Sequence, residues 1–359
     1  MHRRPCESDT DVATHRPPRS GSRFSAMLVG PPPAAARRNH VRKLSLSCLL
    51  MIPVILLFGC KGQVPPRSAG LLTGNHVPQP FTAVSFERLP ETNVSVDAAR
   101  KFKPPMDQDS VELFVYRGDT TYHPLNLCHR FHEFLGAYWK TRDTTFLGHA
   151  RQYVTTLTRI AEDHDGALFL PYRFKYAVHG DSSLQLSPPW YSGMAQGQFL
   201  SVLVRMFEVT GDSLYLDKAK SVVKSLLRPR SAGGPWVARL DSLGFYWIEE
   251  YPLDKQPGMT LNGYVAASYG VYDYRRVVGD SLSVLLYDMV FTTLRHYLPD
   301  YRRPGEMCYY CLGHHHVANE SYHKLHISMM RHLARITGDS FYLTMAEVFE
   351  RDLESANEK

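Results

Sequence analysis

Two short stretches of this sequence place tyrosine beside groups that exchange or orient protons. Tyr251 directly follows Glu250, and Tyr322 opens a segment that continues with His323 and ends at His326. A tyrosine hydroxyl has an ordinary pKa near ~10, so it donates protons well but acts as a base only beside a cation or a hydrogen-bonding partner. The pattern therefore points to acid/base chemistry carried by tyrosine.

The same residues argue against glycosidic hydrolysis. Hydrolysis needs two carboxyl groups that flank one glycosidic bond. Glu249 and Glu250 are sequence neighbours, and on a strand neighbouring side chains point to opposite faces. The competing interpretation of each tyrosine is a buried ring with a hydrogen-bonded hydroxyl, because the chain contains 21 tyrosines.

Four blocks of sequence together resemble one enzyme family. They are Pro189–Gln198, Phe245–Pro252, Asn262-Gly263 and Tyr322–His326. The blocks look like the C-terminal catalytic domain of the D-glucuronyl C5-epimerases, which invert C5 of glucuronate within a heparosan-type polysaccharide. The resemblance is dense from about residue 188 to the C-terminus. It implies a carbohydrate epimerase that needs no cofactor.

The resemblance assigns roles to particular residues. Tyr251 and Tyr322 match catalytic tyrosines of the family, and Glu250 would orient or relay protons. Asn262 matches an active-site asparagine, although one extra residue separates it from Tyr251. Inversion at C5 requires a proton to leave one face of the ring and another to arrive on the opposite face, which fits a pair of tyrosines.

A third catalytic tyrosine of the family has no direct counterpart. An ungapped match places Gly305 at the tyrosine position and Cys308 at that of an arginine three residues later. Tyr309, or its neighbour Tyr310, takes this place if the loop is shorter, and we assign Tyr309. The cation for the substrate carboxylate is then unassigned, and the candidates are His323, His326 and Arg239.

The remaining candidates lie near the first block. Trp190 and Tyr191 could stack on a sugar ring, or they could pack at the start of a helix. Of Gln196 and Gln198, we expect one to line the cavity and the other to be structural. All four are assigned to substrate binding.

Cys308 and Cys311 are separated by two residues and precede His314–His316. In an exported protein they could form a local disulfide, which would leave Cys128 free. Plain packing is a second interpretation, and zinc, which accepts cysteine and histidine, is a third. A single short pair is a weak metal signal, so the prediction assigns no metal.

The N-terminus has the layout of a secretory signal. Arg42-Lys43 precede an uncharged apolar run that begins at Leu44 and ends before Gly59-Cys60. The run is short for a bilayer span. Small Gly59 before Cys60 resembles a bacterial lipobox, so we expect lipidation of Cys60, a membrane anchor, and export to the periplasm or outer membrane. Residues 1–40 are interpreted as a start assigned too far upstream.

Charge argues against a nucleic-acid partner. The formal net charge is +6 over 359 residues. Nine of the 41 basic and three of the 35 acidic residues lie in residues 1–43, so the rest of the chain balances at 32 each. The excess of basic over acidic residues is therefore confined to residues 1–43.

A recurring signature indicates the elements that position these residues. Asp143, Asp212, Asp280 and Asp339 each lie between two helix-like runs, with Gly before three of them. Gly suits a helix end, and Asp suits the N-cap of the next helix. We predict a mainly α fold: an incomplete α/α toroid of about four helical hairpins, with short β-hairpin loops over one mouth.

The predicted domain organisation has three parts. Residues 1–59 are a misassigned start plus signal peptide, residues 60–110 a tether with irregular or short-strand structure, and residues 111–359 the catalytic domain. We expect a uronate C5-epimerase that acts on a polysaccharide, and a homodimer is one possible assembly. The alternatives are a uronate lyase, which shares the proton abstraction, and a glycan-binding lipoprotein without activity.

Overall fold

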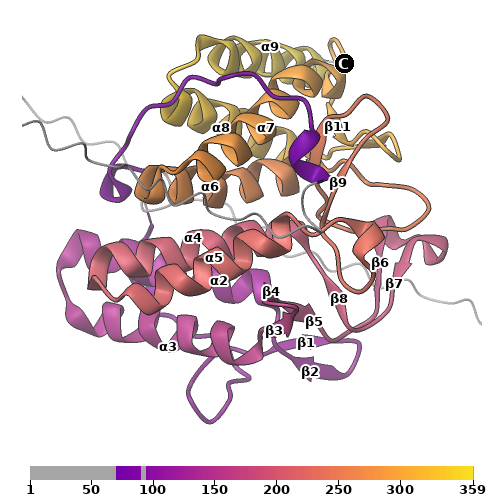
Figure 1. Cartoon of the computed structure of the whole chain (residues 1–359). Helices are drawn as coiled ribbons and strands as arrows, with labels where there is room; N and C mark the ends of the chain where they lie inside the picture. The colour runs from indigo at the N-terminus through magenta and orange to yellow at the C-terminus, as the bar shows by residue number, and fades with distance from the viewer. Residues whose placement is uncertain (1–69, 90–93, 359) are drawn as a thin grey trace, which may run out of the picture. The chain divides into compact units, whose positions relative to one another are not determined.

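The computed structural model describes residues 70–89 and 94–358, all of which belong to one compact unit, Lys61–Lys359 (Figure 1). The expected signal segment and Cys60 lie outside the described residues. Among the helices in the described part of the chain, none combines the length and the apolar character that a membrane crossing requires.

Within residues 70–89 and 94–358, eight long helices form four consecutive hairpins (Figure 1). The hairpins pair α2 (Pro124–Thr141) with α3 (Thr144–Ile160), α4 (Gly193–Thr210) with α5 (Ser213–Leu226), α6 (Leu261–Val278) with α7 (Ser281–Tyr297), and α8 (Glu320–Thr337) with α9 (Ser340–Asn357). The first helix of each hairpin packs against the first helix of the next, in the order α2, α4, α6, α8. This is the inner row of an incomplete α/α toroid, which confirms the predicted fold class.

The Asp signatures cap the second helix of each hairpin, as predicted. The side chains of Asp143, Asp212, Asp280 and Asp339 each accept a hydrogen bond from a backbone N–H in the first turn of the helix that follows. The preceding helix ends in a left-handed residue, at Gly211 with φ 72° for example. Because the caps satisfy N–H groups that a helix leaves unpaired, they fix the tight turns and hold no chemistry.

Helices α4 and α6 approach each other more closely than side chains normally permit. A Cβ atom on Gly270 would lie 2.8 Å from the Gly197 carbonyl carbon and 3.1 Å from the Ser201 nitrogen. In the same interface, Arg205 donates to Asp273 at 2.8 Å, and both side chains are buried. Backbone contact and a buried ion pair therefore fix the centre of the row.

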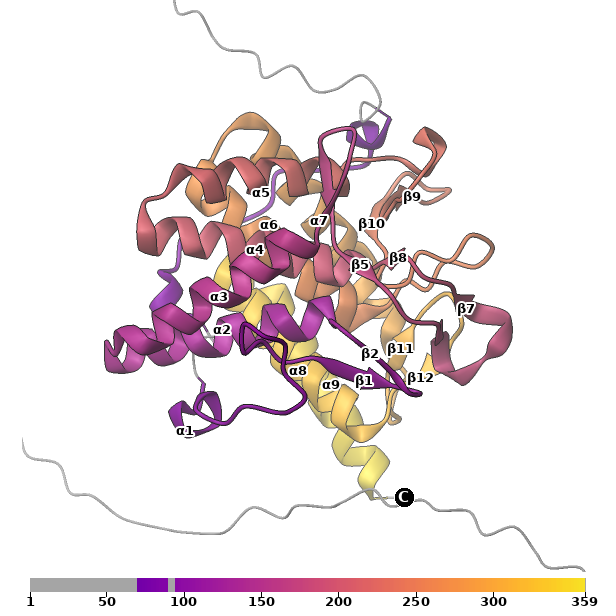
Figure 2. The ribbon, with the colours of Figure 1, turned by 90° about the horizontal axis from the view of Figure 1, so that it is seen from below.

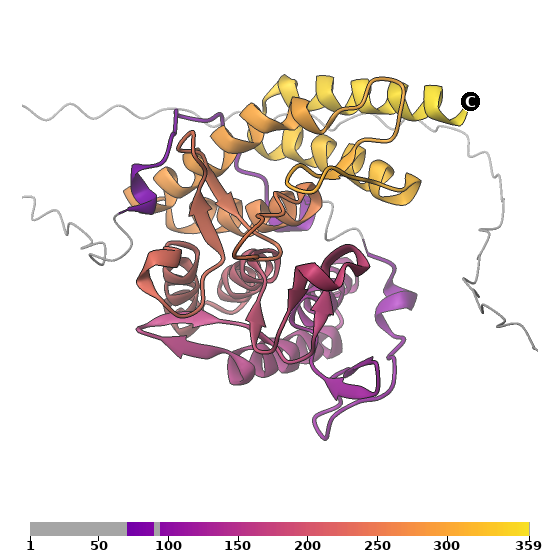
Figure 3. The same cartoon turned by 90° about the vertical axis from the view of Figure 1, so that its right-hand side faces the viewer.

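The strands form six two-stranded antiparallel sheets that gather at one end of the helices (Figures 1 and 2). The pairs are β1 (Phe114–Tyr116) with β2 (Asp119–Thr121), β3 (Glu162–His164) with β4 (Ala167–Phe169), β5 (Pro171–Tyr172) with β8 (Trp190–Tyr191), β6 (Tyr176–Ala177) with β7 (Gln185–Leu186), β9 (Ala238–Leu240) with β10 (Tyr246–Ile248), and β11 (Tyr309–Cys311) with β12 (His316–Val317). Figure 3 faces this end. The predicted β-hairpin loops over one mouth are thus present.

The segment 70–89 contains only two short 3-10 turns, η1 (Leu71–Thr73) and η2 (Phe86–Arg88), but it packs on the helices. The Gln79 N–H donates to the Asp288 carboxylate on α7, and the Thr82 N–H donates to the Ile336 carbonyl on α8. Phe86 is buried beside Arg205 and Arg276. This part of the expected tether segment is therefore bound along the helical layer.

The remaining short elements lie before the first hairpin or between hairpins. They are α1 (Val96–Ala99), η4 (Val178–Gly180), η5 (Ser182–Leu184), η6 (Arg230–Ala232) and η7 (Leu298–Tyr301). A second, aromatic core lies under the strands and includes Tyr172, Phe174, Trp190 and Leu253, with Tyr176 and Tyr251 packed on it. Apolar packing therefore holds the rings of Tyr176 and Tyr251 in place.

Candidate active site

A cavity of about 350 Å³ opens at the strand end of the helices. Its walls come from β6 and η4, the segment after β10, the β11–β12 hairpin and the start of α8. The lining residues are Tyr176, Val178, His179, Gly180, Tyr251, Tyr310, His316, Val317, Ala318, Asn319 and Tyr322. Four tyrosines from four separate segments thus meet around one space.

The four tyrosines form two ring pairs. Tyr176 stacks on Tyr251 with ring centroids 5.4 Å apart, and Tyr310 meets Tyr322 edge to face at 4.9 Å. The first pair lies on the aromatic core, where Trp190 stacks on Tyr172 at 4.0 Å. The second pair joins the β11–β12 hairpin to the first turn of α8. Tyr322 is the most exposed of the four, at 38%.

Glu250 supplies a carboxyl group to this tyrosine cluster. Its side chain packs against the first turn of α6, where a Cβ on Gly263 would lie 2.6 Å from the Glu250 Cβ and 2.8 Å from its carboxyl carbon. Glycine at position 263 is therefore a condition for this placement. One carboxyl oxygen, Oε2, is buried and has no hydrogen-bond partner within the described part of the chain. Such a buried, unpaired oxygen is often a sign of function.

Burial raises the pKa of Glu250 to about 7, although hydrogen bonds with the Tyr251 and Tyr310 hydroxyls act in the opposite direction. The carboxyl group therefore changes protonation state near neutral pH, which suits a group that exchanges protons. Ordinary glutamate side chains are fully ionised there.

The tyrosine hydroxyls are electrostatically linked to Glu250. Burial and the nearby Glu250 charge raise the pKa values of Tyr251, Tyr310 and Tyr322 above the ordinary value. Side-chain hydrogen bonding also connects Tyr310 to both Tyr251 and Tyr322. In the resting state, these tyrosines are protonated, and a chain of hydroxyl groups connects them to one titrating carboxyl group.

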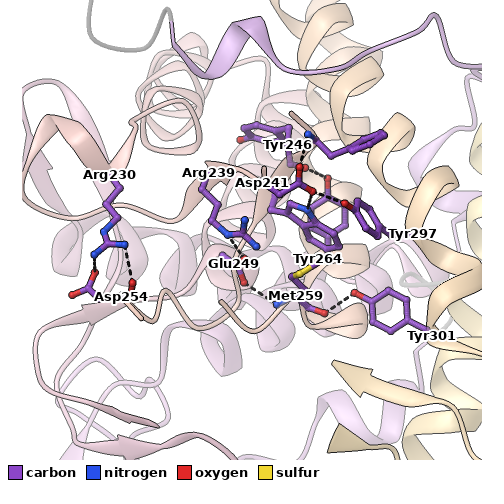
Figure 4. Close-up of polar contacts among 12 residues, drawn as sticks. Arg230, Arg239, Asp241, Tyr246, Glu249, Asp254, Met259, Tyr264, Tyr297 and Tyr301 are labelled. Carbon is purple, nitrogen blue, oxygen red and sulfur yellow. Dashed lines mark hydrogen bonds and ion pairs between the residues drawn. The ribbon is translucent and has the colours of Figure 1, made fainter. Parts of the chain in front are cut away.

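A separate set of polar contacts fixes the segment that carries Glu250 and Tyr251 (Figure 4). Arg239 on β9 donates to Glu249 at 2.7 Å, and the Met259 N–H donates to the other Glu249 oxygen at 3.0 Å. Tyr301 in η7 donates to the Met259 carbonyl at 2.5 Å. Glu249 therefore ties its segment to β9 and to the backbone at Met259, while Glu250 faces the tyrosines.

Several predicted site residues lie outside the cavity wall. The structure places Tyr310 rather than Tyr309 at the cavity, because the Tyr309 ring packs against His315 and lies under Arg303. Trp190 donates to the Phe174 carbonyl at 2.8 Å, and Tyr191 donates to Glu162 at 2.6 Å. Both rings support the neighbouring strands instead of facing the cavity.

The predicted amide residues are all buried. Gln196 bonds with the backbone of Leu168 and Leu170, and Gln198 donates to the Ala266 carbonyl at 2.6 Å. Neither lines the cavity, so the expected division of the two glutamines between cavity and structure is not seen. Asn262 lies on the first turn of α6, and its buried Oδ1 has no partner among residues 70–89 and 94–358.

The three cations suggested for a substrate carboxylate are engaged elsewhere. Arg239 is paired with Glu249. His323 accepts from the Cys308 N–H at 2.9 Å, and its other ring nitrogen lies 2.8 Å from the Phe349 carbonyl. His326 lies 3.2 Å from the Cys308 sulfur, and burial lowers its pKa to about 3. In the described residues, the cavity wall contains no lysine or arginine.

Cys308 and Cys311 do not form the disulfide considered above, and both are buried free thiols. Their side chains contact different histidines. Cys308 faces His326, whereas Cys311 lies 3.3 Å from His179. Burial and the neighbouring His316 and His314 lower the pKa of His179 to about 4.

Several residues of the cavity could not be recognised from the sequence. Tyr176 and His179 lie in a strand-and-turn segment without a recognisable motif, and Asn319 is the N-cap of α8. Only its position before a helix could have drawn attention to Asn319. These residues reach the cavity through chain folding.

A family model described as D-glucuronyl C5-epimerase C-terminus matches residues 162–351, slightly more than half of the chain. The chain belongs to this family. The matched range contains all eleven residues of the cavity wall as well as Glu250. Family membership and the tyrosine cavity therefore concern the same part of the molecule.

Two curated relatives illustrate the match. An uncharacterised protein of Methanocaldococcus jannaschii is 30% identical over 174 residues, which are 48% of this chain and 54% of that protein. The D-glucuronyl C5-epimerase of Caenorhabditis elegans is 30% identical over 178 residues, 44% of this chain and 28% of that enzyme. The chain thus spans about half of the first relative and about a quarter of the second.

Solved structures with detectable similarity include two carbohydrate-active enzymes. The cellobiose 2-epimerase of Bacillus thermoamylovorans has a TM-score of 0.45 and 14% identity, and the match covers 64% of this chain and 60% of that chain. The unsaturated glucuronyl hydrolase of Bacillus sp. GL1 has a TM-score of 0.42 and 15% identity, with 64% and 61% covered.

Proposed function

We propose that this protein is an epimerase that inverts C5 of D-glucuronate residues within a heparosan-like polysaccharide. The observation that carries the proposal is the cavity in which four tyrosines meet beside the buried Glu250 carboxyl group, whose Oε2 has no hydrogen-bond partner in the described part of the chain. Membership of the D-glucuronyl C5-epimerase family supports the choice of reaction.

In the proposed reaction, protons move between the sugar and the hydroxyl chain. One tyrosine oxygen takes the proton from C5 while its own proton passes toward the Glu250 carboxylate. The electron pair left at C5 delocalises into the sugar carboxylate as an enolate. A tyrosine on the other ring face then donates a proton to C5, and Glu250 returns its proton to the hydroxyl chain. We assign Tyr251 to one face and Tyr322 to the other.

Charge on the enolate needs hydrogen-bond donors near the sugar carboxylate. His179, His316 and Asn319 are the polar residues of the cavity wall besides the tyrosines. We assign substrate binding to His316 and Asn319, because the Nε2 atom of His179 already contacts His314 and Cys311. Glu250 would not serve this purpose, because its charge repels a uronate.

The test incubates the purified full-length protein with heparosan and other glucuronate polymers in deuterated water. Deuterium at C5 and unsaturated chain ends are measured in the same samples. We expect deuterium at C5 with intact chains. Tyr251→Phe and Tyr322→Phe should each lower the exchange rate by about 10²- to 10⁴-fold, the usual contribution of one acid/base group.

Tyr309→Phe is the matched control, because its ring lies next to that of Tyr310 in sequence but outside the cavity wall. It should retain the parent exchange rate. Unsaturated ends would instead identify a lyase, and the absence of exchange from a folded sample on every uronate tested would overturn the epimerase proposal.

A further inference from the structure

Three side chains beside the cavity bring metal-binding atoms together. They are His179 in η4, Cys311 on β11 and His314 in the turn between β11 and β12. His179 Nε2 lies 3.2 Å from His314 Nδ1, and the Cys311 sulfur lies 3.3 Å from the first nitrogen and 3.5 Å from the second. The three atoms form a nearly equilateral triangle.

The triangle has the dimensions of one face of a tetrahedral zinc site. Zinc binds nitrogen at about 2.0–2.1 Å and sulfur at about 2.3 Å, so neighbouring ligands are separated by roughly 3.3 Å for two nitrogens and roughly 3.6 Å for nitrogen and sulfur. The observed separations are 3.2 Å for the nitrogens and 3.3 and 3.5 Å for the sulfur. A zinc ion fits with little movement of the side chains.

We propose that His179, Cys311 and His314 bind one zinc ion, with a water molecule as the fourth ligand. Two imidazoles and one thiolate are ligands that zinc accepts. Binding replaces the proton on the Cys311 sulfur, and that proton passes to the solvent.

The backbone already holds two of the ligands in position. Cys311 forms a β-bridge with Thr260, and the Gly313 N–H donates to the Gly258 carbonyl at 3.0 Å. A Cβ on Gly313 would lie 2.9 Å from the Pro257 carbonyl carbon, so glycine permits this close approach. Cys311 and His314 are therefore fixed to one loop, and His179 arrives from a distant segment.

The zinc ion would connect two walls of the cavity. His179 follows Tyr176 by three residues, and Cys311 directly follows Tyr310. His179 also stacks on His316 at 4.1 Å, and both of these rings line the cavity. A metal bond between η4 and β11 would hold the two tyrosine pairs in a constant relative position.

Metal content of the full-length protein tests the proposal. The purified chain is treated with a chelator, reloaded with zinc, dialysed and analysed by mass spectrometry for metals. We expect about one zinc ion per chain, and His179→Ala and Cys311→Ser should each lower the content at least about tenfold. Cobalt in place of zinc should give a sulfur-to-metal absorption band that Cys311→Ser removes.

His315→Asn is the matched control. His315 belongs to the same run of three histidines but is exposed and has a φ of 50°, a conformation that asparagine tolerates. It should bind zinc as the parent does. Circular dichroism verifies that each variant is folded. A folded parent that binds no zinc, or a folded His179→Ala variant with parental zinc content, would disprove the site, and neither result bears on the epimerase activity.

Discussion

Glu250 shows how surroundings change the chemistry of a single residue. In water its carboxyl group would be ionised at neutral pH. Here it is only 6% exposed and packs against Gly263, and this burial raises its pKa to about 7 although hydrogen bonding with two tyrosines lowers it. Glu249, the preceding residue, instead pairs with Arg239 and supports the loop. Two adjacent glutamates therefore have different tasks.

The raised pKa makes Glu250 destabilise the folded state as pH increases. Between its ordinary value of 4.5 and about 7, the unfolded chain has lost the proton that the folded chain still holds. The free energy of unfolding of the parent should therefore fall, relative to Glu250→Gln, by about 2 kcal/mol between pH 5 and pH 8. Urea unfolding at both pH values measures the difference.

Glu354→Gln provides the comparison for this experiment, because Glu354 lies exposed on α9. Its stability difference from the parent should be the same at both pH values. If Glu250→Gln also shows the same difference at both values, the pKa of Glu250 is not raised in the folded protein.

At the scale of elements, the helices depend on close contact as much as on apolar area. Gly197 and Gly270 let α4 and α6 meet through their backbones, which places the first turns of both helices near the cavity. Glu250 packs on the first turn of α6, and the Gly193 N–H of α4 donates to the Glu249 carbonyl at 2.8 Å. The helix row thus sets the position of the loop that carries Glu249 and Glu250.

Two glycine substitutions should have opposite effects on stability. Gly270→Ala places a methyl group against the α4 backbone and should lower the free energy of unfolding by about 1–3 kcal/mol or more. Gly148 is exposed on α3, and nothing lies near a methyl group added there. Gly148→Ala should therefore raise the free energy of unfolding by about 0.5–1 kcal/mol. Chemical denaturation measures both. Equal effects would contradict the proposed backbone contact.

At the scale of the whole described unit, the segment 70–89 lies along helices distant in the sequence. Tyr287 on α7 donates to the Pro80 carbonyl at 2.7 Å, and Val84 donates to Tyr272 on α6 at 2.9 Å. Phe86, which belongs to this segment, is only 1% exposed. The segment is thus a structural part of the helical unit.

Phe86→Ala tests this integration. Removal of a fully buried aromatic ring should lower the free energy of unfolding by about 3–5 kcal/mol. Val77→Ala, in the same segment but 55% exposed, should change it by less than about 0.5 kcal/mol. Guanidinium unfolding of both variants gives the comparison. A small effect of Phe86→Ala would mean that the segment is only loosely attached.

The helical hairpins and the family could be predicted from the sequence, because caps, periodicity and motif residues act over short distances along the chain. Asp143, Asp212, Asp280 and Asp339 marked four turns, and the blocks around Tyr251 and Tyr322 marked the family. These features depend on local geometry or on residues a few positions apart.

Only the tertiary structure decided which side chains share the cavity. Tyr176 and His179 join Tyr310 and Cys311 across more than 130 positions of sequence, and no local pattern encodes that meeting. Adjacent strand residues point to opposite faces, so one of Tyr309 and Tyr310 had to face away from the cavity, and the packing of the hairpin selects Tyr310 to line it. The pKa of Glu250 likewise depends on burial, which is a property of the packed chain and not of its neighbours in sequence.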